Sequence, residues 1–112
     1  IYPTDVERIA ERVPGVRAGN SVAVQWSDGG IRETFAVGVE SREADQREVT
    51  VRISREVAAQ LVDQLGVRPA YVGVLMPGTL PKTPSGKIQR DRAREVLHDF
   101  RGSRGDDRVG TT

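Results

Sequence analysis

Ten residues, 81–90, constrain the fold of this chain most strongly, because they suit neither a helix nor a regular strand. Pro81, Pro84 and Gly86 lie within six positions of one another. Proline fixes φ and lacks a backbone N–H, whereas glycine adopts φ values that other residues avoid. The segment therefore predicts a shaped loop. It follows an apolar, strand-like run and precedes a helix-like run, so the loop must join a strand to a helix.

The same loop holds both lysines of the chain, Lys82 and Lys87. A lysine ammonium is a compact charge on a flexible stem, and Lys87 at the loop's exit suits contact with a phosphate or carboxylate. Ser85 and Gly86 beside it would let the backbone approach a ligand closely. The segment is not a Walker A loop, because Pro81 stands where that pattern needs a glycine. From the residues alone, a solvated basic loop explains the pattern equally well, and both interpretations stay open.

The first forty residues predict a helix followed by a β-hairpin. Thr4 and Glu7 fit a capping box with Thr4 as N-cap, and apolar residues continue at helical spacing to Val13 before Pro-Gly ends the helix. Residues 21–26 and 32–40 read as two strands around a turn cluster at 27–30. Trp26 is expected to pack in the core or close the sheet edge.

The middle segment can be interpreted in two ways at its start. Val49, Val51 and Ile53 alternate like a strand, but apolar residues also recur at every fourth position as far as Leu65. That repeat is too long for a strand, so we expect a helix over residues 48–65 that Gly66 ends.

The last part predicts a third strand, the loop and a terminal helix. The near-continuous apolar run at 69–76 indicates a central strand covered on both faces. Residues 90–100 carry one apolar stripe, and residues 101–112 have almost none, which is typical of a disordered tail. The fold class is therefore α+β: a small three-stranded sheet flanked by helices, in one domain over residues 1–100.

Composition narrows the function. Cysteine is absent and His98 is the one histidine, so disulfides, thiolate sites and multi-histidine metal sites are excluded, and we expect no metal site. His98 itself is expected on the surface. A net charge of +1 is not that of a nucleic-acid binder. No run is long enough to span a membrane and no signal peptide is visible, so the cytoplasm is expected. Since residue 1 is not methionine, we expect a piece of a longer chain.

Two motifs give the chain a family resemblance. Residues 81–90 resemble the final motif of the adenylate-forming enzymes, Pro-Lys-Thr-x-Ser-Gly-Lys-Ile-x-Arg. Residues 1–7 resemble the Ile-Tyr-Pro-x-Glu/Asp-Ile-Glu segment that opens the C-terminal domain of those enzymes. The superfamily includes acyl-CoA synthetases, fatty acyl-AMP ligases, peptide-synthetase adenylation domains and luciferases. The resemblance covers residues 1–100.

The resemblance implies a mobile lid domain that closes over a large N-terminal domain. That domain, which is not in this chain, would bind ATP with Mg²⁺ and the carboxylic acid. Lys87 would be the catalytic residue that contacts the substrate carboxylate and the adenylate, with Ser85 and Gly86 also at the nucleotide. The acid would attack the α-phosphate, giving acyl-AMP and pyrophosphate, and the lid would then rotate so that a thiol takes the acyl group.

Within the superfamily the sequence is most similar to fatty acyl-AMP ligases. The connector at 16–19 fits their Val-Arg-x-Gly, and residues 77–81 fit their Pro-Gly-x-Leu/Ile-Pro. Such ligases pass a fatty acyl group to the phosphopantetheine thiol of an acyl carrier protein. The Gly-x-Pro-Asp segment of acyl-CoA synthetases is missing from residues 22–30. The alternatives are a fatty acyl-CoA synthetase domain and a non-catalytic, partner-binding domain of the same fold. Without the N-terminal domain, the fragment is expected to adenylate nothing.

Overall fold

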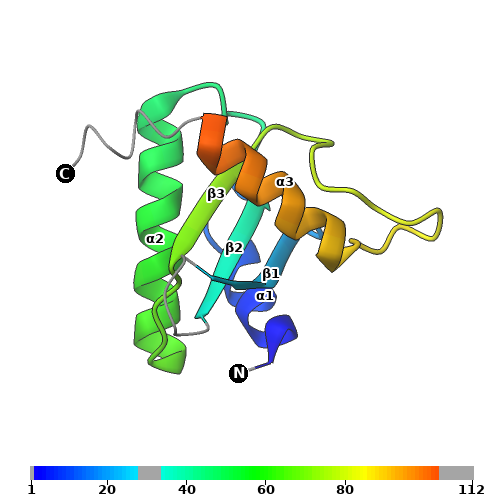
Figure 1. Cartoon of the computed structure of the whole chain (residues 1–112). Coiled ribbons are helices and arrows are strands. Elements are labelled where there is room, and N and C mark those ends of the chain that lie inside the picture. Colours follow the sequence, from blue (N-terminus) through cyan, green and yellow to red (C-terminus); the bar gives the residue numbers. More distant parts are fainter. Residues whose placement is uncertain (1, 28–33, 104–112) are drawn as a thin grey trace.

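The chain forms three layers, a small sheet between helices, in a computed structural model that describes residues 2–27 and 34–103. The sheet lies in the middle, with α1 and α2 on one face and α3 on the other (Figure 1). In chain order the elements are α1 (Pro3–Glu11), β1 (Ser21–Trp26), β2 (Thr34–Glu40), α2 (Arg47–Leu65), β3 (Tyr71–Leu75) and α3 (Arg90–Ser103). The predicted α+β class, with three strands and flanking helices, is confirmed.

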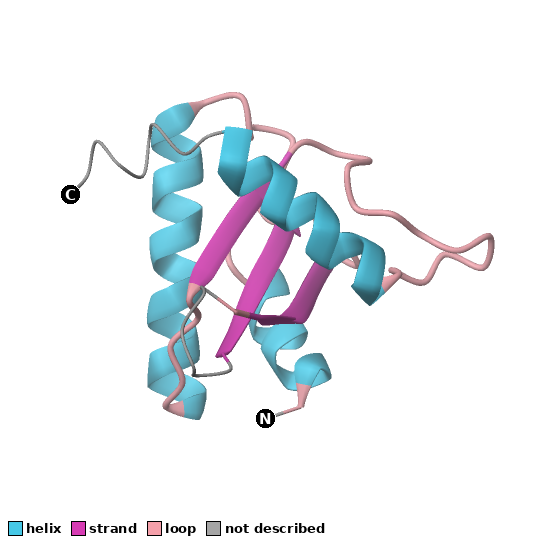
Figure 2. Ribbon diagram, in the orientation of Figure 1, coloured by secondary structure: helices cyan, strands magenta, loops and turns pink. Residues whose placement is uncertain are grey.

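The sheet is mixed, in the order β1-β2-β3 (Figure 2). β1 and β2 run antiparallel, with Ser21 opposite Val39, so the predicted hairpin is confirmed. β2 and β3 run parallel, with Glu40 opposite Leu75. Residues 28–30 of the predicted turn and residues 32–33 of the predicted second strand lie outside the described residues.

The prediction that the third strand is central is wrong, because β2 occupies the centre and β3 an edge. The apolar run of β3 has another cause. Its side chains alternate between two cores: Val74 packs with the residues of α1 and α2, and Leu75 packs with those of α3. An edge strand covered on both faces thus carries the same continuous apolar pattern as a central one.

The predicted capping box at the start of α1 is also wrong. The helix begins at Pro3 with Tyr2 as N-cap, and no side chain caps it. Proline suits this first position, because its φ is already helical and it has no N–H that needs a cap. Glu7 is then available for other contacts: its carboxylate accepts the backbone N–H of Ala23 on β1 at 2.8 Å.

The long helix agrees with its four-residue repeat. α2 begins at Arg47, so the ambiguous residues at its start are helical, and Ile53, Val57 and Leu61 are buried along one side. Gly66 follows the helix with a φ of 68°, a left-handed conformation that favours glycine and commonly ends helices.

Two apolar clusters hold the layers together, one on each face of the sheet. The cluster under α1 and α2 contains Val6, Ile9, Ala10, Val13, Ala23, Val37, Val39, Ala44, Ile53, Val57, Leu61 and Val74. The cluster under α3 contains Val22, Val24, Trp26, Ala36, Leu75, Leu80, Ala93 and Leu97. Leu80, just before the predicted loop, is therefore a core residue that attaches the loop to the sheet.

Two neighbouring glycines let α3 lie close to the sheet. Gly38 on β2 pairs with Gly73 on β3, and the side chain of Leu97 packs over both. A Cβ added at Gly73 would lie 2.8 Å from Cδ2 of Leu97, and one at Gly38 would lie 3.1 Å from the same atom. Any larger residue at either position would push Leu97, and with it α3, away from the strands.

An aromatic stack holds the C-terminal half of α3 against the sheet. The Trp26 ring is only 2% exposed and lies nearly parallel to the exposed His98 ring, with centroids 3.8 Å apart. The Arg101 guanidinium lies over Tyr71, 5.3 Å from the ring centroid. Such contacts favour a continued helix, so α3 runs to Ser103 and the tail predicted from residue 101 does not begin there. Residues 104–112 of that tail lie outside the described residues.

We expect Gly73→Ala to lower the free energy of unfolding by about 1–3 kcal/mol, because the new methyl group overpacks Leu97. Urea denaturation of the 112-residue chain measures this. In a Leu97→Ala background the cost of Gly73→Ala should largely vanish, since the clashing atom is gone.

Gly102→Ala is the matched control, because an added Cβ there meets nothing within 4 Å and alanine favours a helix. Equal destabilisation by Gly73→Ala with and without Leu97 would contradict the close-approach explanation.

Candidate functional site

The loop predicted from the sequence is a narrow hairpin, here called the lysine hairpin (residues 81–89). Lys82 and Ile88 form an isolated antiparallel bridge, and the Thr83 N–H donates to the Lys87 carbonyl at 2.7 Å. The turn closes when the Gly86 N–H donates to the Thr83 carbonyl at 2.8 Å. Gly86 has a φ of 89°, which other residues rarely adopt, so the turn depends on glycine there.

Hydroxyl groups inside the turn add to its rigidity. The Thr83 hydroxyl accepts the Lys87 N–H at 3.2 Å and lies 2.9 Å from the Ser85 hydroxyl. Ser85 and Gly86 are both exposed at the tip. Their predicted contact with a nucleotide stays a prediction, and the structure gives Ser85 an additional role within the turn.

Lys87 lies on the returning arm of the hairpin and is exposed. It lines a cleft of about 440 Å³ together with Glu7, Glu11, Gly19 and Arg90. Within residues 2–27 and 34–103 its ammonium forms no ion pair. Lys82 on the opposite arm is exposed as well and lines a different cleft. The two lysines of the motif therefore face different surroundings.

A buried glutamate fixes the start of the lysine hairpin. Glu40, at the end of β2, is 1% exposed. Its two carboxylate oxygens accept the N–H of Gly78 at 3.0 Å and the N–H of Leu80 at 2.8 Å. Arg17 donates to the same carboxylate at 3.2 Å. Sequence reasoning missed Glu40; the only local signal is an acidic residue at the end of an apolar strand.

An ion pair fixes the other end. The Arg90 guanidinium contacts both carboxylate oxygens of Glu7 at 3.1 Å, which joins the first residue of α3 to α1. The Gln89 N–H also donates to the Pro81 carbonyl at 2.9 Å, which brings the two ends of the hairpin together. Arg90, whose role the sequence left open between steadying the loop and facing a partner, thus contacts α1 in this structure.

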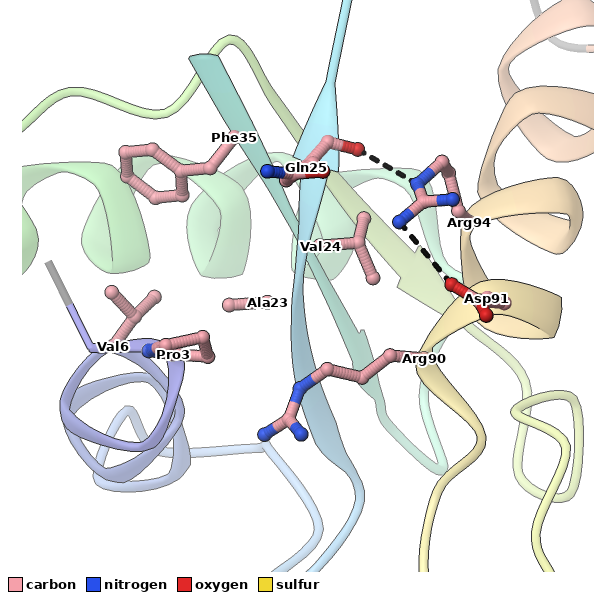
Figure 3. A pocket seen from close by; sticks show the side chains of 9 residues that line it. All are labelled: Pro3, Val6, Ala23, Val24, Gln25, Phe35, Arg90, Asp91 and Arg94. Atoms are coloured by element: carbon pink, nitrogen blue, oxygen red, sulfur yellow. Dashed lines mark hydrogen bonds and ion pairs between the residues drawn. The ribbon is translucent and has the colours of Figure 1, made fainter. Parts of the chain in front are cut away.

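Figure 3 shows the pocket between α1, β1 and α3, which Arg90 also lines. Its volume is about 340 Å³, and its apolar side includes Val6, Val24 and Phe35. The Arg94 Nε–H donates to the Gln25 carbonyl at 3.0 Å, and Arg94 lies 3.5 Å from Asp91. Together with the contact from Glu7 to Ala23, this bond occupies backbone groups on the open edge of β1, which protects that edge from pairing with another strand.

Among the described residues, no three His, Cys, Asp or Glu side chains lie close enough together to hold a metal ion. No described helix is both long and apolar enough to cross a bilayer.

Comparison with known families and proteins gives consistent matches. Residues 1–92 match the sequence model of the family described as AMP-binding enzyme C-terminal domain. The chain is 53% identical over 90 residues to "Putative ligase Rv1013" of Mycobacterium tuberculosis, which covers 80% of this chain and 16% of that protein.

Two further relatives carry different activities in their names. The 3-hydroxybenzoate–CoA ligase of an Aromatoleum species is 30% identical over 87% of this chain and 18% of its own length. The 4-hydroxyphenylalkanoate adenylyltransferase of Mycobacterium tuberculosis is 30% identical over 88% of this chain and 16% of its own length. The chain thus spans less than a fifth of the length of the curated relatives that it matches.

Solved structures share the fold. The McyG A-PCP structure complexed with phenylalanyl-adenylate superposes with a TM-score of 0.81 at 22% identity, over 93% of this chain and 19% of that one. A structure from work on fatty acyl-adenylate ligases of E. coli and L. pneumophila has a TM-score of 0.68 at 26% identity, over 95% of this chain and 18% of that one.

We expect Arg90→Gln to lower the protection of the Gln89 amide against hydrogen exchange, because the exit of the lysine hairpin loses its attachment to α1. Arg90 is 46% exposed, so global stability should fall by less than about 1 kcal/mol. Exchange measured by NMR separates the two effects.

Arg92→Gln serves as the control, because Arg92 is exposed on the same helix and has no ion pair among the described residues. If the Gln89 amide is equally protected against exchange in both variants, the ion pair does not fix the hairpin.

Proposed function

Because the chain belongs to the AMP-binding enzyme C-terminal domain family, we propose that it is the C-terminal domain of a larger ligase that activates a fatty acid with ATP. The products of this step are acyl-AMP and pyrophosphate. The observation that carries the proposal is the placement of Lys87: an exposed cation, without an ion pair among the described residues, on a hairpin fixed at both ends. Such a group can be presented to a site on another domain.

Lys87 would act by stabilising charge. When a carboxylate attacks the α-phosphate of ATP, two anions approach and negative charge builds on the phosphate oxygens. A preplaced ammonium between them favours that arrangement without reorganising at the moment of reaction. Ser85 and Gly86 lie beside Lys87 at the exposed tip, where an added Cβ on Gly86 meets nothing within 4 Å. The tip is therefore open for a ligand to approach the backbone.

The chain supplies one side of this site. ATP and its Mg²⁺ would be held mainly by the N-terminal domain, which would also bind the fatty acid and set its chain length. A ligase of this kind would work in the cytoplasm, where ATP and the acyl acceptor are present.

We propose an acyl carrier protein as the acceptor, through its phosphopantetheine thiol. The Val-Arg-x-Gly connector and the likeness to the fatty acyl-adenylate ligase structure support this choice. A fatty acyl-CoA synthetase is the second candidate. It is supported by the 30% identity of this chain to a CoA ligase, which equals its identity to the adenylyltransferase. A non-catalytic, partner-binding domain is the third candidate, and the Lys87 variant below distinguishes it.

We expect Lys87→Ala in the full-length protein to slow acyl-AMP formation roughly 10²–10³-fold, the usual effect of removing one contact that stabilises transition-state charge. Mass spectrometry of acyl-AMP in single-turnover reactions measures the rate. Lys82→Ala is the matched control, because it removes an exposed lysine from the opposite arm of the same hairpin. A loss below tenfold for Lys87→Ala, or an equal loss for Lys82→Ala, would refute the catalytic role.

The 112-residue chain alone should catalyse no ATP–pyrophosphate exchange, because half of the site lies on the other domain. Exchange above the level of a Lys87→Ala chain would contradict this division.

For the acceptor, we expect the full-length protein to load a phosphopantetheinylated carrier protein much faster than free CoA at equal thiol concentration. Faster thioester formation with CoA would favour the second candidate.

A further inference from the structure

We propose that Glu40 is a positioning residue for the adenylation step: its buried carboxylate holds the start of the lysine hairpin and so determines where Lys87 lies. The inference rests on the proposed function of Lys87. In Figure 1 the segment between β3 and α3 projects away from the sheet, so its direction depends on how its two ends are held.

The Glu40 contacts join distant parts of the chain. Gly78 and Leu80 are 38 and 40 residues away in sequence, and each donates its backbone N–H to a different oxygen of the one carboxylate. Both donors are backbone N–H groups. The two bonds therefore fix the path of the main chain rather than the position of one side chain. Leu80 is also 3% exposed, which leaves its side chain little freedom.

From Leu80 the path to Lys87 is short and hydrogen-bonded. Pro81 follows directly, and its carbonyl accepts the Gln89 N–H at 2.9 Å. The Lys82–Ile88 bridge comes next, and the Thr83 N–H then donates to the Lys87 carbonyl at 2.7 Å. A shift at Leu80 is therefore transmitted along a closed ladder to the arm that carries Lys87.

A charged group at this position needs an explanation beyond stability. Burying a carboxylate costs solvation free energy, and an apolar residue of similar size commonly serves a core as well. The Glu40 carboxylate is directed at the hairpin segment and at Arg17, whose side chain is 35% exposed and comes from the connector before β1. Arg17 neutralises the charge but contacts no residue of the lysine hairpin through this bond.

This geometry provides a matched pair of variants. Glu40→Gln and Arg17→Gln each remove the same ion pair, but only Glu40→Gln disturbs the hairpin. Its single amide oxygen accepts one backbone N–H, while its amide nitrogen faces the other. Arg17→Gln leaves both N–H bonds in place. The double variant Arg17→Gln/Glu40→Gln leaves neither the Arg17 guanidinium nor the buried Glu40 carboxylate without its partner, so it keeps the test available if either single variant folds poorly.

In the full-length protein we expect Glu40→Gln, and the double variant, to lower kcat for acyl-AMP formation at least tenfold while KM for ATP changes little. Arg17→Gln should stay within about threefold of the wild type. The decisive arm repeats Glu40→Gln in a Lys87→Ala background, where no further loss is expected because the two residues act as one unit.

Two results would overturn the inference: an equal fold-loss from Glu40→Gln with and without Lys87, or equal losses from Glu40→Gln and Arg17→Gln. Protection of the Gln89 and Thr83 amides against exchange gives a readout independent of activity, and Glu40→Gln should lower it where Arg17→Gln does not. If Lys87→Ala alone leaves the rate of acyl-AMP formation unchanged, the proposed catalytic role of Lys87 fails, and the amide protection still decides whether Glu40 holds the hairpin.

Discussion

Leu97 lies against the sheet only because two glycines, paired across neighbouring strands, leave room for it. Gly38 and Gly73 form a flat site on the face of the sheet opposite α1 and α2, and the Leu97 side chain fills it. This contact sets the distance between α3 and the strands. Since α3 begins with Arg90, it also sets where the lysine hairpin must end. The geometry of the candidate site thus depends on Gly38 and Gly73, which leave room in the core because they have no Cβ atom.

The two ends of the lysine hairpin are held by different kinds of contact. At its start, the Glu40 carboxylate accepts two backbone N–H groups, and the bond from Leu80 is buried, where hydrogen bonds are strong. At its exit, the half-exposed pair between Arg90 and Glu7 is weaker and more sensitive to salt. The attachment of the lysine hairpin is therefore stronger at its start than at its exit.

Local patterns in the sequence predicted most of the fold. The four-residue repeat predicted α2 and its glycine end, and the density of proline and glycine predicted the loop. The same reasoning failed where a local pattern has two physical causes. The apolar run of β3 indicated a central strand, but two helix layers produce it at an edge. Thr4 resembled a cap, but the helix already begins one residue earlier, at Pro3.

The contacts that hold the site could not be read from the sequence. Glu40 binds residues 38 and 40 positions away, and Arg90 binds a residue 83 positions away. No spacing rule links such residues, because the strands and helices must first be assembled. Lys87 was singled out by its motif, whereas the residues that support it were found only from the three-dimensional arrangement.

The stack of Trp26 on His98 has a practical consequence. Trp26 is the single indole in the chain, and its ring joins an edge strand to the second half of α3. Intrinsic tryptophan emission from this domain therefore originates at one place, where helix and sheet meet. A change in how α3 seats on the strands would alter the surroundings of that ring directly. The domain carries its own optical probe, and no dye or label needs to be attached.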